Sequence, residues 1–206
     1  MTDRPILFSA PMVRALLEGR KTQTRRLLKL RGHKRFSDFG PSDTPGYEWH
    51  FRRADGCWCD HRQSDLPLPY AIGDRLWVKE EWQVSGLGYG VKLPIPGMGR
   101  LHYSATDDGA WKDYWGRWRS SLHMPRWASR LTLTVNDVRV QRLQDISEAD
   151  AIAESVQIHC GSDGAKVEFE HIWNSINGPE AWDANPWVVA LTFEVEQRNI
   201  DAGGAA

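Results

Sequence analysis

The sequence predicts an α+β fold: a small, mostly antiparallel β-barrel with short helices at its ends and loop insertions. Segments in which apolar and polar residues alternate recur along the chain, separated by Gly, Pro and Asp turn signals. The stretches with helical spacing of apolar residues are short, and they do not alternate regularly with the strands. This order argues against a doubly wound parallel sheet and favours a barrel.

The chain of 206 residues is expected to form one domain over residues 1–200, followed by a flexible tail at 201–206. Two stretches rich in Gly, Pro and polar residues, at about 31–70 and 86–125, are expected to be insertions. Within the first insertion, alternation over residues 47–52 predicts a small hairpin arm. We expect this insertion to lie outside the barrel, as an arm or a lid over its mouth.

The first elements are a strand over residues 5–8 and an amphipathic helix over residues 11–18, which Ser9 can cap and Gly19 can end. A capping-box pattern at Ser147 marks the start of a later helix. Further strands are predicted over residues 75–82, 101–105, 128–140 and 187–195, and further helices over residues 112–119, 147–155 and 167–177.

The composition restricts the classes of partner. The 26 Lys and Arg nearly balance the 27 Asp and Glu, which argues against a globally basic surface for nucleic acid. Eleven Trp are expected mostly in the core, with a few able to stack on a flat ligand. The chain opens without a signal segment and holds no apolar run that could span a membrane. We therefore expect a cytoplasmic protein with reduced thiols and no membrane partner, and its oligomeric state stays open.

Charge is concentrated directly after the first helix. Four cations and two hydroxyls fall within residues 20–26, and Thr22 and Thr24 alternate with longer polar side chains, as in a strand. One interpretation is a basic, solvated edge strand. The other is a site for an anionic or electron-rich ligand, because concentrated fixed cations attract such partners.

The same segment resembles the opening motif of the ASCH family, a branch of the PUA-like barrels, in Glu18-Gly19-Arg20-Lys21-Thr22-Gln23-Thr24-Arg25-Arg26. Later parts of the family pattern are similar to residues 73–78, 143–154 and 187–195. Residues 124–130 and 185–188 extend the resemblance to the larger ASCH proteins of phages and prophages. The resemblance implies a PUA-like barrel, in a chain much longer than the small members of the family.

The resemblance also implies two functions. Some small ASCH proteins are amidohydrolases that remove the acyl group from N4-acylated cytidine with a Lys, a Thr and a Glu, and others are thought to bind or cut RNA. The Lys and the Thr match Lys21 and Thr24, and the Glu matches Glu154, with Glu148 as the alternative if the register differs. Our leading hypothesis is therefore an amidohydrolase that acts on a small nucleoside without metal or other cofactor.

In this hypothesis Thr24 is the nucleophile, Lys21 the base, and Glu154 the acid or the contact to the base edge. Lys21 can act as a base only if burial and neighbouring cations lower its pKa. Lys21 and Thr24 would point to opposite faces of an ideal strand, so they converge only if residues 19–22 are still turning out of the helix. A flat pyrimidine needs a stacking face and a polar clamp, for which the candidates are Phe8, Arg26 and Trp82.

Two other functions stay open: an RNA-binding ASCH module that uses the Arg side chains of the opening motif and exposed Trp, and a phage assembly factor. Cys57, Cys59 and His61, with residues 159–160, are potential metal ligands. Their spacing is not one that zinc sites use, so we interpret them as ordinary thiols and a loop histidine.

Overall fold

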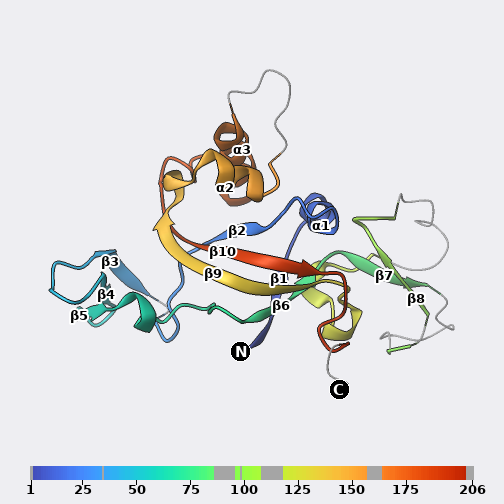
Figure 1. The fold of residues 1–206 in the computed structure, drawn as a ribbon, viewed down its shortest axis with the longest axis horizontal. Coiled ribbons are helices and arrows are strands. Elements are labelled where there is room, and N and C mark those ends of the chain that lie inside the picture. The colour runs from blue at the N-terminus through green and yellow to red at the C-terminus, as the bar shows by residue number, and fades with distance from the viewer. Residues whose placement is uncertain are drawn as a thin grey trace.

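The computed structural model describes residues 2–33, 35–85, 96–97, 99–107, 118–156 and 164–202. At its centre is a five-stranded sheet in the order β1-β6-β9-β10-β2 (Figure 1). Its strands are β1 (Asp3–Leu7), β2 (Gln23–Leu27), β6 (Arg75–Lys79), β9 (Thr132–Arg142) and β10 (Trp187–Glu196). Only β1 and β6 run parallel, so the predicted α+β fold with mostly antiparallel strands is confirmed.

The predicted closed barrel is not formed, because no backbone ladder joins the edge strands β1 and β2 among the described residues. The chain passes from β1 to β2 through helix α1 (Ala10–Leu17), whose Val13 and Leu16 pack into the main core beside the strands. A side chain spans the two edges instead: Arg26 Nη2 donates to the Leu7 carbonyl at 2.7 Å. The sheet is therefore curved but open (Figure 1).

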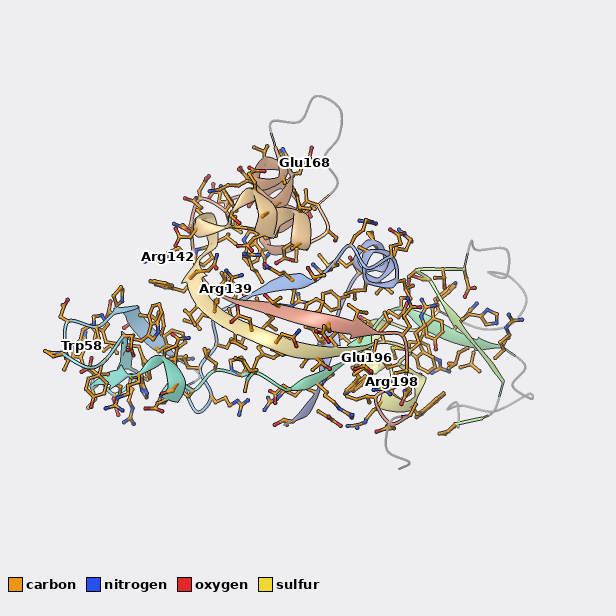
Figure 2. The ribbon with its side chains drawn as sticks, viewed as in Figure 1. Trp58, Arg139, Arg142, Glu168, Glu196 and Arg198 are labelled. Carbon is orange, nitrogen blue, oxygen red and sulfur yellow. The ribbon has the colours of Figure 1, made fainter. Side chains whose placement is uncertain are left out.

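The first insertion carries a sheet of its own, formed by β3 (Phe36–Pro41), β4 (Trp49–Arg53) and β5 (Trp58–His61). This arm extends from one end of the main sheet, with Trp58 at its outer end (Figures 1 and 2). It is larger than the predicted hairpin by one strand. An aromatic contact joins the arm to the main sheet: the rings of Trp49 on β4 and Trp187 on β10 pack edge to face, with their centres 5.4 Å apart.

The predicted strand over residues 75–82 is wrong in its extent. β6 ends at Lys79, and β7 (Trp82–Ser85) pairs with β8 (Arg100–Tyr103) in a separate two-stranded sheet. Trp82 exchanges backbone hydrogen bonds with Arg119 rather than with the main sheet. The chain leaves the main sheet where Glu80 is buried against Arg130, so an apolar–polar alternation continues across a break between two sheets.

Helices α2 (Glu148–Ala153) and α3 (Ala165–Asn177) pack together above the β2 edge around a second apolar cluster (Figure 1). Ser147 caps α2 by accepting from the Asp150 N–H at 3.1 Å, and Gly178 ends α3 with φ at +115°. Short 3₁₀-helices occupy Gln63–Asp65, Ser121–His123, Arg126–Ala128 and Leu143–Asp145. The predicted helix over residues 112–119 lies outside the described residues except for its last two. Among the described helices, none has the length and apolar character needed to cross a membrane.

Candidate active site

The turn between α1 and β2 brings the opening motif into the interior. Gly19 adopts φ +71°, and the N–H groups of Arg20 and Lys21 both donate to the Ala15 carbonyl, at 2.9 and 3.1 Å. Lys21 therefore still belongs to the turn that ends the helix, and β2 begins only at Gln23. This is the geometry that frees Lys21 and Thr24 from opposite faces of one strand.

Lys21 is fully buried and paired with Glu154 at the C-terminus of α2. Its Nζ donates to Glu154 Oε2 at 2.7 Å and to the Glu154 carbonyl at 2.9 Å. β2 is an edge strand, as one interpretation expected, but that interpretation is wrong about solvation, because Lys21, Thr24 and Arg25 are buried. Glu148, the alternative register, lies elsewhere: its carboxylate accepts from the Ala165 N–H at the start of α3, at 2.7 Å.

Arg25 brings a second cation to the same carboxylate. Its Nη1 lies 3.3 Å from Glu154 Oε1, and its Nη2 lies 3.0 Å from Asp150 Oδ2. Burial by itself would raise the pKa of Asp150, but a hydrogen bond from Gln23 and the nearby Arg25 lower it on balance. Two buried cations thus face two carboxylates. We refer to Lys21, Arg25, Asp150 and Glu154 as the Lys21 cluster.

The pKa of Lys21 is lowered from its ordinary value of 10.5. Burial is the largest cause, the ion pair with Glu154 opposes it, and the charges of Arg26 and Arg25 add to the lowering. The amine thus loses its proton more readily than an exposed lysine does. Lowering of this kind is what a lysine needs in order to act as a base.

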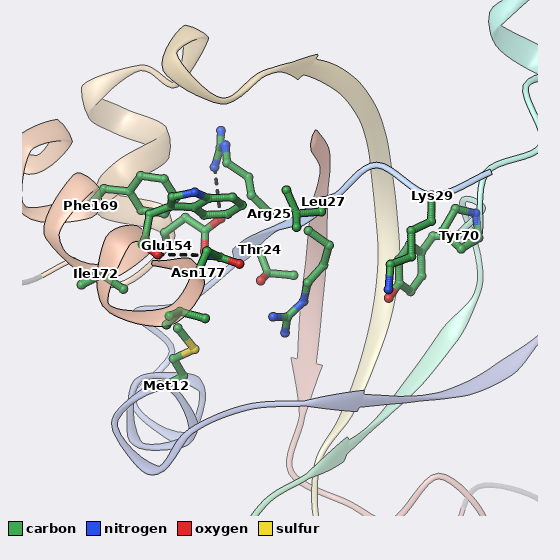
Figure 3. A pocket seen from close by; sticks show the side chains of 14 residues that line it. Met12, Thr24, Arg25, Leu27, Lys29, Tyr70, Glu154, Phe169, Ile172 and Asn177 are labelled. Carbon is green, nitrogen blue, oxygen red and sulfur yellow. Dashed lines mark hydrogen bonds and ion pairs between the residues drawn. The ribbon is translucent and has the colours of Figure 1, made fainter. Parts of the chain in front are cut away.

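A cavity of about 310 Å³ opens beside the cluster, between β2 and α3 (Figure 3). This is within the range of about 300 to 1,000 Å³ in which small-molecule sites are found. Thr24 and Glu154 line it, and the Thr24 hydroxyl makes no hydrogen bond to another described residue. The remaining lining residues are Met12, Arg25, Arg26, Leu27, Lys29, Pro69, Tyr70, Phe169, Ile172, Trp173, Ile176 and Asn177.

A larger cavity of about 700 Å³ adjoins the first along α1 and α3. The two share Met12, Glu154, Phe169, Ile172 and Ile176, so they form one groove in which Glu154 lies at the junction. A ligand at Thr24 in the first cavity therefore has room to extend past Glu154 into the second.

The predicted substrate contacts have different positions. Arg26 lines the first cavity, and its guanidinium lies 5.1 Å from the centre of the Phe8 ring. Phe8 itself is buried behind the cavity wall, where Lys21 Nζ is 5.7 Å from its ring. The prediction for Trp82 is wrong: it is 1% exposed and packs with Met124 in a separate apolar cluster.

Sequence reasoning missed the aromatic wall of the cavity. Phe169 and Trp173, four residues apart on α3, both line the cavity, and neither was predicted as a site residue. Tyr70 and Lys29 also line it and were not predicted. The aromatic residues at helical spacing were the one available signal, since a helix face that meets a cavity has the same pattern as one that meets a core.

The other candidate groups remain apart from this site. Cys57 and Cys59 are free thiols, and no group of three His, Cys, Asp or Glu in the described part of the chain could hold a metal. Residues 159–160 lie outside that part. Of the cations proposed for RNA, Arg20 pairs with Glu18 and Arg25 is buried. The opening motif therefore does not present a continuous basic surface.

The arrangement can support acyl transfer, since it combines a hydroxyl in a cavity, a buried amine with a lowered pKa, and a carboxylate that lines the cavity and is hydrogen-bonded to the amine. Cations at the cavity wall can stabilise developing negative charge. Comparisons of the chain with protein-family models, with curated proteins and with solved structures find no match.

Proposed function

We propose that this chain is an amidohydrolase that removes the acyl group from N4-acylated cytosine nucleosides such as N4-acetylcytidine. In this proposal the curved sheet corresponds to a PUA-like barrel whose edge strands, β1 and β2, do not pair. Catalysis uses Lys21, Thr24 and Glu154 without metal. One observation carries the proposal: fully buried Lys21 is hydrogen-bonded to Glu154 at 2.7 Å, beside a cavity that Thr24 lines. Burial of a lysine in a single ion pair is costly, which argues for a function.

The reaction begins when neutral Lys21 takes the proton of the Thr24 hydroxyl and the oxygen attacks the amide carbonyl carbon. The tetrahedral oxyanion is stabilised by the guanidinium groups at the wall, those of Arg25 and Arg26. The C–N4 bond then breaks, and N4 of cytosine takes up a proton delivered by Lys21 or Glu154. Water then attacks the acyl-Thr24 ester, releases the carboxylic acid and restores the hydroxyl.

Binding of the base follows from the same wall. Phe169 and Trp173 offer apolar ring surfaces for a flat pyrimidine, and their burial keeps water from the reacting amide. Asn177 Nδ2 donates a hydrogen bond to the Trp173 carbonyl oxygen at 3.1 Å. This bond fixes the Asn177 side chain at the cavity and leaves its Oδ1 as an acceptor for the base. Arg26 supplies donors for the carbonyl and ring nitrogen of the base.

The RNA-binding alternative has weaker support. A module of this kind needs cations that are free to reach phosphates along an extended strand. In this chain Arg25 belongs to the buried cluster, and Arg20 pairs with Glu18. The most exposed described Trp on the arm, Trp58, is 55% exposed but lies at the outer end of the arm, away from β2 (Figures 1 and 2). A phage assembly role has no structural feature that favours it.

The test is incubation of the purified protein with N4-acetylcytidine, followed by chromatography for cytidine. We expect turnover by the wild type and a loss of about 10³-fold or more in Thr24→Ala, the scale on which removal of a nucleophile acts. Thr24→Ser should keep a measurable fraction, because the attacking oxygen survives and only a rotamer restraint is lost. Thermal unfolding of both variants should match the wild type, since the hydroxyl has no described partner. Unchanged turnover by Thr24→Ala would exclude Thr24 as the nucleophile.

A further inference from the structure

We propose that the acylated cytidine carries a phosphate on its ribose, so that the substrate is an N4-acylated cytidine monophosphate rather than the uncharged nucleoside. The inference rests on the proposed function and concerns the part of the cavity away from Thr24. The charges that line the cavity differ between the side at the Lys21 cluster and the opposite side, and this difference carries the inference.

On the inner side the charges are matched. Lys21 lies 2.7 Å from Glu154, and Arg25 lies 3.3 Å from Glu154 and 3.0 Å from Asp150. Arg139 also lies 3.4 Å from Asp150 and pairs with Asp137 at 3.0 Å, so with these two included three cations face three carboxylates, and no net charge is left for an ionic ligand. This side of the cavity is therefore suited to the acyl amide of the substrate, which carries no charge.

The other side of the cavity has a surplus of positive charge. Arg26 and Lys29 line the cavity, and neither lies within ion-pair distance of a carboxylate in the described part of the chain. The only acidic residue in the lining is Glu154, which the cluster already engages. Arg26 uses one nitrogen on the Leu7 carbonyl and is partly buried, which lowers its pKa. Glu154 acts on Arg26 only from beyond ion-pair distance and is already paired with Lys21, so this side of the cavity keeps positive charge that an anionic ligand would stabilise.

The positions of these cations suit a ribose phosphate. Residues advance about 3.3 Å each along a strand, so Arg26 lies roughly 7 Å beyond Thr24 on β2, and Lys29 lies farther in the same direction. Figure 3 shows Lys29 and Tyr70 on the side of the cavity opposite Glu154 and Phe169. The acyl group at N4 must lie at Thr24, and the ribose is attached to the other edge of the base. The phosphate therefore reaches the end of the cavity that Lys29 lines, beyond Arg26.

The experiment compares kcat/KM for N4-acetylcytidine and for N4-acetylcytidine 5′-monophosphate at low ionic strength. We expect the wild type to prefer the nucleotide by about tenfold or more, as charge-assisted contacts to a phosphate usually do. Lys29→Gln should reduce that preference to about twofold or less, the effect expected from the remaining, more distant cations after screening by salt. Added salt should reduce the wild-type preference too. Arg62→Gln, which removes one exposed positive charge away from the cavity, should keep the preference.

The outcomes separate this inference from the proposed function. Equal kcat/KM values for the two substrates would overturn the inference and leave the amidohydrolase intact. If neither is hydrolysed, the proposed function fails, and calorimetry with cytidine 5′-monophosphate and cytidine decides the inference: tighter binding of the nucleotide supports it, and equal binding overturns it. A preference for an internal N4-acetylcytidine in an RNA oligonucleotide over the mononucleotide would also overturn it, in favour of an RNA substrate.

Discussion

Two buried ion-pair clusters in the described part of the chain can be compared: the Lys21 cluster, which meets a cavity, and a second one, which meets neither of the two cavities described above. In the second cluster, Glu80 accepts from Arg130 Nε and Nη2, both at 2.9 Å, and the Arg130 guanidinium lies 4.0 Å from the Tyr103 ring centre. We call Glu80, Arg130 and Tyr103 the Glu80 cluster. Its one carboxylate is matched by one guanidinium in two parallel hydrogen bonds. No member of it lines either of the two cavities described above.

The difference shows what a buried ion pair indicates and what it does not. Burial raises the pKa of Glu80 against the opposing effect of Arg130, and burial raises the pKa of Tyr103 to about 12. Perturbed acids therefore occur in both clusters, so perturbation alone does not mark a site. The Lys21 cluster differs because a hydroxyl without a described partner and a cavity lie beside it. We infer that the Glu80 cluster holds β6 and β7 in place and that the Lys21 cluster is catalytic.

Among substitutions at residues other than the nucleophile Thr24 and the base Lys21, we expect Glu154→Gln to lower kcat the most. The change keeps the shape of the side chain but removes the carboxylate that pairs with Lys21 and can deliver a proton to N4, so kcat should fall by about 100-fold or more. Glu148→Gln is the matched control, because Glu148 caps α3 through the Ala165 N–H rather than joining the cluster. We expect it to keep kcat and to lose about 1 kcal/mol of stability at most. Loss of activity in the control instead would show that Glu148 is the catalytic carboxylate.

The Glu80 cluster should respond in stability and not in chemistry. Arg130→Met leaves Glu80 buried without its cation, and we expect a loss of up to about 3 kcal/mol, somewhat below the usual cost because Arg130 is 25% exposed. Turnover per folded molecule should stay within about twofold of the wild type, since the cluster does not contact the cavity. Arg198→Met is the control: Arg198 pairs with Glu196 on the surface beyond β10 (Figure 2), and it should cost less than about 1 kcal/mol.

The pH dependence of the stability of the Arg130→Met variant tests whether buried Glu80 causes the loss. The pKa of Glu80 is raised in the folded protein above 4.5, so the folded state holds this proton to higher pH than the unfolded state does. Stability from this group is therefore present at low pH and is lost as the pH rises from about 4.5 through the folded pKa. Urea unfolding should show that the variant is closer to the wild type at pH 5 than at pH 8. A constant difference across this range would mean that Glu80 does not carry the effect.

The sequence allowed several local features to be predicted because they depend on neighbouring residues. Gly19 ends α1 at a positive φ and Ser147 caps α2, as turn and cap chemistry requires. The placement of Lys21 and Thr24 followed from the same local turn together with the family resemblance. These features need no knowledge of what packs against them.

Features that depend on distant partners were predicted less well. The alternation through Leu76, Val78 and Trp82 continues across the break at Glu80, and the pairing of Glu80 with Arg130, which lies far along the chain, is not visible in that pattern. Closure of the barrel depends on whether β1 and β2 meet, and α1 and Arg26 occupy that position instead. The helical spacing of Phe169 and Trp173 is the same whether the face meets a core or a cavity.

The central claim is that Lys21 acts as a base, and the pH profile of kcat/KM in the wild type and in Lys21→Arg tests it most directly. The wild-type rate should rise with pH along a limb below 10.5, because the pKa of Lys21 is lowered and only the neutral amine accepts a proton. Lys21→Arg keeps the charge but cannot lose its proton, so we expect a loss of about 10³-fold and no such limb. Lys21→Met, which has a similar length and no charge, should be equally inactive, and thermal unfolding identifies which variants are folded. A folded Lys21→Arg variant that keeps wild-type turnover and the same limb would contradict the claim, and a water activated by Glu154 would become the attacking group.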